Sequence, residues 1–268
     1  QVASSVARAH PEQPVLYLTG EESAAQVKKR AERIGAITDG LYLAAESDLG
    51  QALGQVEETG AEAGGPQLTI MDSVQTFSSA AVDGAAGGVT QIREVTASMI
   101  EAAKRKNMTT ILVGHVTKDG NIAGPRMLEH LVDVVCQFEG DRHSRLRLVR
   151  AVKNRFGPTD EVGCFDMTEK GIESLADPSG LFLSHRGRTP DGSAVTVAMD
   201  GVRPILAEVQ ALTVDPVNKS PRRVVTGLDF NRVPMVLAVL QARCGERTND
   251  KDAYVATVGG VKITDRKS

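Results

Sequence analysis

The stretch LTIMDS (Leu68–Ser73) is a mostly apolar run that ends in a carboxylate. Such a run is typical of a buried strand in a parallel sheet that helices cover on both faces. Ligands bind these sheets at the carboxyl ends of the strands, which is where Asp72 is expected to lie. An aspartate in this place can hold Mg²⁺ on a nucleotide. Because runs of this kind are common, the role of Asp72 has to be decided by the rest of the chain.

Strand and helix patterns alternate on both sides of this stretch. Apolar residues between Val89 and Ala103 recur at helical spacing, and repeated strand–helix–strand units predict an α/β fold with a mostly parallel sheet. The expected elements are strands at 14–18, 41–43, 67–72, 110–114 and 132–138, the last three of them buried, and helices at 23–34, 48–56 and 89–103.

After Gly157 the chain becomes richer in turn residues and short strands. Strands are expected at 194–199, 204–209 and 254–256, and a helix at 229–243. This pattern predicts a second, smaller α+β unit. The boundary is expected near Asp177-Pro178-Ser179-Gly180, which divides the chain into domains 1–177 and 178–268.

Composition limits the functional classes. With 3% aromatic residues and no Trp, the core has to be built from Val, Leu, Ile and Ala. A net charge of −3 excludes a protein that binds nucleic acid over its whole surface, so any DNA contact must come from a local basic loop or from a ring of subunits. No apolar run reaches membrane-spanning length and no signal peptide is visible, which predicts a cytoplasmic protein without membrane contact.

The three cysteines, Cys136, Cys164 and Cys244, are far apart in the sequence. Their spacing fits neither a metal site nor a disulfide framework. They are expected to be small residues of the core.

Polar residues follow two more of the expected strands. Glu21 and Glu22 come after the first strand, where a carboxylate can orient or deprotonate a water molecule. Alternatively they open a helix that Ser23 caps. His115 follows strand 110–114 and can donate a hydrogen bond to a terminal phosphate, although a single histidine in this position is more often structural.

The stretch KNRFG (Lys153–Gly157) follows a strand-like run at 145–152. Alternation along a strand places Lys153 and Arg155 on one face. Two neighbouring cations repel each other unless an anion lies near them, and a polyphosphate is a suitable anion. The alternative is a strand end exposed to solvent.

Two glycine-containing stretches are expected to form loops. The first, 83–88, leads to Arg93, and the second, 116–126, carries Lys118 and Arg126. Their glycines and cations suit contact with a polyanion.

The order of these motifs is that of a RecA-type ATPase core, and the sequence resembles the bacterial RadA (Sms) family of DNA-repair ATPases along nearly its whole length. The stretches that carry the resemblance are GEES (20–23), MDSVQT (71–76), VDGAAGGVTQIRE (82–94), GHVTKDG (114–120), AGPRMLEHLVD (123–133), FEGDRHSRLR (138–147), KNRFGPTDEVGCFDM (153–167) and DPSGLFLS (177–184).

The resemblance implies a homo-hexameric ring with ATP or ADP and Mg²⁺ between subunits. It implies that Glu21 is the catalytic carboxylate, with Glu22 as the alternative. Asp72 would bind Mg²⁺ through water, and His115 would be the sensor. Lys153 and Arg155 would reach the neighbouring subunit's ATP.

The resemblance also implies a DNA-dependent ATPase and branch-migration helicase that acts on recombination intermediates. Its partners would be single-stranded and branched DNA and the recombinase RecA. Loops 83–93 and 117–128 would face DNA, with Arg93, Lys118 and Arg126 near the phosphates.

From about 178 onward the chain resembles the Lon-protease-like domain of the same family. It lacks a serine in a Gly-Pro-Ser-Ala-Gly context, so no peptidase activity is expected. Arg222 and Arg223 form a basic patch that could contact DNA, or else belong to a solvated linker.

The family's GxxxxGK[ST] phosphate loop and its amino-terminal four-cysteine zinc finger are absent from the sequence. Both are expected upstream of Gln1, so Zn²⁺ would bind only through a finger outside this chain. Three alternatives stay open: a paralogue that has lost its ATPase activity, a nucleotide-dependent regulatory or scaffold ring of the KaiC type, and a Lon-type peptidase.

Overall fold

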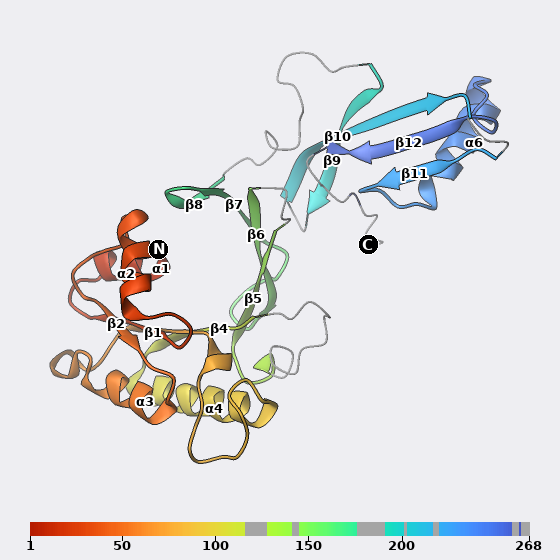
Figure 1. Cartoon of the computed structure of the whole chain (residues 1–268). Coiled ribbons are helices and arrows are strands. Elements are labelled where there is room, and N and C mark those ends of the chain that lie inside the picture. The colour runs from red at the N-terminus through yellow and green to blue at the C-terminus, as the bar shows by residue number, and fades with distance from the viewer. Residues whose placement is uncertain are drawn as a thin grey trace. The chain divides into compact units, whose positions relative to one another are not determined.

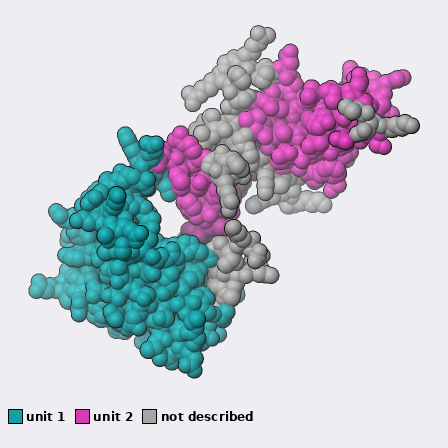
Figure 2. Space-filling model, in the orientation of Figure 1, with its two compact units in different colours: residues 1–135, 153–157, 169–172 teal, residues 136–152, 158–168, 173–268 magenta. Residues whose placement is uncertain are grey.

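The computed structural model describes residues 1–115, 128–140, 145–175, 191–200, 203–216, 220–258 and 263. They form two compact units, which Figure 2 colours separately. Unit 1 contains 1–135, 153–157 and 169–172, and unit 2 contains 136–152, 158–168 and 173–268. The boundary expected at 177–178 lies outside the described residues.

Unit 1 is built on a parallel sheet in the order β2-β1-β3-β4. The strands are β1 (Val15–Thr19), β2 (Leu41–Ala45), β3 (Leu68–Asp72) and β4 (Thr109–Val113). Thr19 pairs with Asp72, and Asp72 pairs with Val113, so the strands end in register. The parallel sheet and the α/β fold class are confirmed.

Helices cover both faces of this sheet (Figure 1). Helix α1 (Val2–Ala9) packs on one face through Ala3 and Ala7, against Val15, Leu68 and Ile70. The opposite face carries a larger apolar cluster built from α3 (Leu49–Glu58) and α4 (Val89–Lys106) with β1 and β3. The remaining helices of unit 1 are α2 (Ala24–Arg33) and the short 3-10 turns η1 (Ala61–Ala63) and η2 (Val74–Thr76).

The burial of the strands differs from one to the next. The first four residues of β3, Leu68 to Met71, are buried, as the apolar run predicts. The expectation that β4 and β5 (Val134–Glu139) are buried is wrong. Strand β4 is at the edge of its sheet, so one flank has no neighbouring strand among the described residues.

Two further sheets account for the remaining strands. One has the order β5-β6-β7-β8, and β6 pairs antiparallel with β7. The other has the order β11-β12-β10-β9, with antiparallel pairing except between β11 and β12. Their bounds are β6 Leu146–Asn154, β7 Val162–Thr168, β8 Gly171–Ser174, β9 Ser193–Asp200, β10 Arg203–Val214, β11 Arg223–Thr226, α6 Arg232–Cys244 and β12 Asp252–Thr257.

The sequence did not indicate β11, where a basic patch or a linker was expected. The cysteines are also only partly as expected. All three are free and Cys164 is buried, but Cys136 and Cys244 are exposed and do not belong to the core. Within the described part of the chain, no helix is both long enough and apolar enough to span a membrane.

Gln91, near the start of α4, organises the segment that precedes this helix. Its side chain is 2% exposed. Oε1 accepts a hydrogen bond from the amide of Ser79 at 2.7 Å, and Nε2 donates to the carbonyls of Ser79, Val82 and Gly84 at 3.1, 2.7 and 3.2 Å. One buried amide therefore fixes the backbone of residues 79–84.

We predict that Gln91→Ala lowers the free energy of unfolding by about 1–3 kcal/mol, because buried backbone groups lose their partners. Urea denaturation measures this loss, and proteolysis should become faster at residues 79–88. Glu101→Ala, on an exposed position of α4, is the control and should change stability by less than about 0.5 kcal/mol. Equal stability of the two variants would contradict the prediction.

Candidate active site

The carboxyl edge of the parallel sheet gathers residues from three adjacent strands. Glu21 follows β1, Asp72 ends β3 and His115 follows β4. Because β1, β3 and β4 are neighbours in the sheet and end in register, these three residues meet at one edge. The amide of Gly20 donates to the carbonyl of Asp72 at 2.9 Å, which joins the first two strand ends directly.

The carboxylate of Glu21 lies at the centre of this edge. Its Oε1 accepts a hydrogen bond from Ser73 Oγ at 2.7 Å and lies 3.1 Å from His115 Nε2. The side chains of Glu21 and His115 are 44% and 59% exposed, so a water molecule or a substrate can reach them. Sequence reasoning missed Ser73, although its place directly after Asp72 was the available signal.

The carboxylate of Glu22 contacts a residue outside this edge. Its carboxylate forms a bidentate ion pair with Arg30 on α2, at 3.2 and 2.5 Å. Ser23 caps α2 in a reciprocal pair with Gln26, as the helix-start interpretation predicted. The two neighbouring glutamates are thus sorted by their contacts: Glu22 belongs to the helix start, and Glu21 belongs to the sheet edge.

Asp72 is held by one tyrosine. The hydroxyl of Tyr17 donates to Asp72 Oδ2 at 2.5 Å. Burial, and then the hydrogen bond to Asp72 and its charge, raise the pKa of Tyr17 well above its usual value, so the phenol stays a donor. Sequence reasoning missed this tyrosine too, because it lies inside an apolar strand.

The donor set fits Mg²⁺. No described residue donates to Asp72 Oδ1, which leaves that oxygen available at the sheet edge. Mg²⁺ prefers oxygen ligands and is usually held by one or two carboxylates together with substrate phosphates and water. No cluster of three or more His, Cys, Asp or Glu side chains that could hold a metal occurs among the described residues.

Gly20 allows the strand ends to approach closely. A Cβ atom at this position would lie 2.1 Å from Thr76 Oγ1, which is far below van der Waals contact. That hydroxyl donates to the carbonyl of Ser73 at 2.7 Å. Gln75 Nε2 donates to the carbonyl of His115 at 3.1 Å, so the turn after β3 also fixes the end of β4.

Lys153 and Arg155 both contact one short segment of the chain. Lys153 Nζ donates to the carbonyls of Glu129 and Val132 at 2.6 and 2.8 Å. Arg155 Nη1 lies 2.7 Å from Asp133 Oδ1. The two side chains therefore turn the same way. A lysine ammonium has three N–H donors, so Lys153 keeps one beyond these two bonds.

The candidate DNA-binding residues have different surroundings. Arg93 is exposed on α4, whereas Lys118 and Arg126 lie outside the described residues. The amide of Arg222 bonds Asp252 at 2.7 Å.

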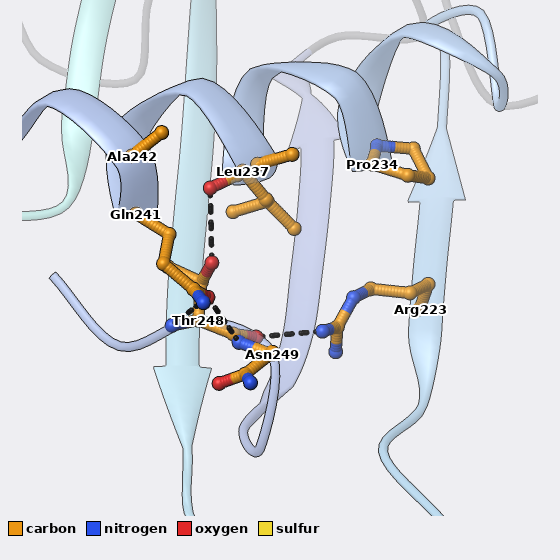
Figure 3. Close-up of a pocket in the computed structure, with 8 residues that line it drawn as sticks. Arg223, Pro234, Leu237, Gln241, Ala242, Thr248 and Asn249 are labelled. Atoms are coloured by element: carbon orange, nitrogen blue, oxygen red, sulfur yellow. Dashed lines mark hydrogen bonds between the residues drawn. The ribbon is translucent and has the colours of Figure 1, made fainter.

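Arg223 lines a pocket beside α6, where its guanidinium donates to the carbonyl of Thr248 (Figure 3). The guanidinium also donates to the carbonyl of Lys251. Thr248 in turn donates to the carbonyl of Leu237 at 3.0 Å. The guanidinium of Arg223 therefore serves the fold.

Comparisons with known proteins show which family the chain is similar to. A family described as "AAA domain" matches residues 1–121. DNA repair protein RadA of Mycolicibacterium smegmatis is 56% identical over 96% of the chain and 55% of that protein. RadA of Mycobacterium tuberculosis H37Rv is 52% identical over 93% of the chain and 52% of that protein. RadA of Streptococcus pyogenes serotype M1 is 50% identical over 93% of the chain and 54% of that protein.

A crystal structure of the RadB recombinase is 19% identical, with a TM-score of 0.45, and covers 62% of the chain and 80% of that structure. The chain spans about half the length of the curated relatives it matches. At 50–56% identity over nearly its whole length, the chain belongs to the bacterial RadA family.

Proposed function

We propose that the chain is the motor core of a DNA-dependent ATPase that drives branch migration of recombination intermediates during DNA repair. The observation that carries this proposal is the meeting of Glu21, Asp72 and His115 at the carboxyl edge of the parallel sheet. The names of the relatives, DNA repair protein RadA, support it.

Each residue at the edge has its own task in this proposal. Glu21 orients and deprotonates the water that attacks the terminal phosphate. Asp72 would hold Mg²⁺, usually by way of water, and the bound ion would supply positive charge that neutralises the phosphates. His115 lies against Glu21 and begins the segment that leads to residues 116–127.

Lys153 and Arg155 act on a neighbouring subunit in a homo-hexameric ring. Positive side chains supplied in trans stabilise the charge that develops on a transferred phosphoryl group. Both cations leave the end of β6 in the same direction, which suits joint contact with one polyphosphate.

The DNA partners are single-stranded and branched DNA, and the recombinase RecA is the protein partner. Residues 83–93, the last five of which begin α4, and residues 117–128 face DNA in this proposal, with Arg93, Lys118, Arg126 and Arg222 near the phosphates. Residues 178–268 form a Lon-protease-like domain that supports the ring without cleaving peptides. The protein acts in the cytoplasm in this proposal.

The contacts of the two glutamates generate a matched pair of variants. We predict that Glu21→Gln in the full-length protein lowers ATP hydrolysis by about 10²–10⁴-fold while ATP still binds, because the base that activates water is lost. Glu22→Gln removes only the exposed ion pair with Arg30 and should keep hydrolysis within about twofold. Phosphate release with and without single-stranded DNA measures both variants.

The wild type in this experiment tests the proposed function itself. Hydrolysis that rises on addition of single-stranded DNA supports the motor. ATP hydrolysis at the same rate with and without single-stranded DNA would favour the regulatory or scaffold ring. A wild type without any hydrolysis would leave the ATPase assignment untenable.

A second prediction concerns the cation pair. Lys153→Ala or Arg155→Ala should lower ATP hydrolysis and branch migration by about 10³-fold or more, since fingers of this kind contribute about 10³–10⁵. Lys104→Ala removes an exposed cation from α4 and should leave both activities unchanged. Circular dichroism checks that the variants fold. Wild-type rates in the Lys153 and Arg155 variants would refute their role.

A further inference from the structure

Tyr17 is placed by two constraints that the sheet imposes. Tyr17 and Thr19 lie on the same face of β1, and Thr19 pairs with Asp72 on β3. Two residues span about 6.6 Å along a strand, which a tyrosine side chain can bridge diagonally. The hydroxyl of Tyr17 thus arrives at Asp72 Oδ2, at 2.5 Å.

The tyrosine ring is fixed in this direction by packing. It lies against the apolar cluster that α1, β1 and β3 form around Val15, Leu68 and Ile70. Its hydroxyl is part-buried, and no other described residue donates to the Asp72 carboxylate. Tyr17 is therefore the group that determines how Asp72 turns its two oxygens.

This hydrogen bond makes the two oxygens of the Asp72 carboxylate different from each other. Oδ2 is occupied by the phenol, and Oδ1 is left for other partners. Groups that hydrogen-bond a metal-binding carboxylate orient it and commonly change metal affinity when they are removed. A free aspartate, by comparison, rotates about its terminal torsion and offers its oxygens in many directions.

We propose that Tyr17 is a positioning residue that holds Asp72 so that Oδ1 faces the Mg²⁺ of a bound Mg²⁺–nucleotide. The inference rests on the proposed function, because it requires Asp72 to be the carboxylate that holds Mg²⁺. Tyr17 itself touches neither the metal nor the nucleotide.

The test is Tyr17→Phe in the full-length protein, which removes one oxygen atom and keeps the packed ring. Mn²⁺ is titrated into the ATP complex and followed by electron paramagnetic resonance. The expected result is Mn²⁺ binding weakened by about tenfold. ATP affinity without metal should stay unchanged, and the Mg²⁺ concentration for half-maximal hydrolysis should rise while the maximal rate is kept.

Tyr42→Phe is the matched control. Tyr42 is exposed on β2 and its hydroxyl forms no hydrogen bond to another described residue, so the same atom change should leave Mn²⁺ binding as in the wild type. Asp72→Asn should weaken Mn²⁺ binding at least as much as Tyr17→Phe. The double variant of Tyr17→Phe and Asp72→Asn should bind no more weakly than Asp72→Asn, because both changes act through one carboxylate.

Three outcomes would overturn the inference. If Tyr17→Phe behaves like Tyr42→Phe while Asp72→Asn is impaired, Tyr17 has no positioning role and the proposed function is unaffected. If Tyr17→Phe also loses metal-free ATP binding, the tyrosine supports the whole site and not the metal. If Asp72→Asn binds Mn²⁺ as the wild type does, Asp72 does not hold the metal, and both this role and the inference about Tyr17 are refuted.

Discussion

The parallel register of β1, β3 and β4 is the constraint on which the rest of the site depends. Thr19, Asp72 and Val113 lie side by side across the sheet, so the chain leaves all three strands at one edge. The register is favoured by side chains that alternate between the two faces, since a slip of one residue would move Leu68 and Ile70 from the cluster around α1 to the opposite face of the sheet. Because the strands are held in this register by the packing of their side chains, Glu21 and His115 lie close together where β1 and β4 end.

The close approach at this edge has a steric condition. The space that a side chain at position 20 would occupy is filled by Thr76, whose hydroxyl bonds Ser73. Ser73 then reaches Glu21, and Gln75 reaches the backbone of His115. Each contact uses a residue of the turn after β3. The geometry of Glu21 is therefore a property of the MDSVQT stretch as much as of its own strand.

Periodicity predicted the sheet and its helices because burial on two faces leaves a strong apolar signal, as in β3. It failed for β4, which is also mostly apolar but lies at the edge of the sheet. Residue type singled out Glu21, Asp72 and His115 as candidates. It could not distinguish Glu21 from Glu22, because the ion pair of Glu22 is with Arg30, eight residues further along the chain. Tyr17 carried no signal, because its hydroxyl finds Asp72 only through strand pairing. β11 was missed because it is only 4 residues long and begins at Arg223, inside the expected basic patch.

The contacts of Lys153 and Arg155 are compatible with the role proposed for them on another subunit's phosphate, as a comparison of energies shows for Arg155. The ion pair of Arg155 with Asp133 has both side chains 57% exposed. Such pairs contribute about 0.2–1 kcal/mol. A cation that stabilises phosphoryl transfer contributes about 10³–10⁵ in rate, or roughly 4–7 kcal/mol at about 1.4 kcal/mol per factor of ten. Loss of the exposed pair with Asp133 would therefore cost less than such a cation contributes to the transition state of phosphoryl transfer. The contact with Asp133 is therefore no obstacle to the role proposed for Arg155.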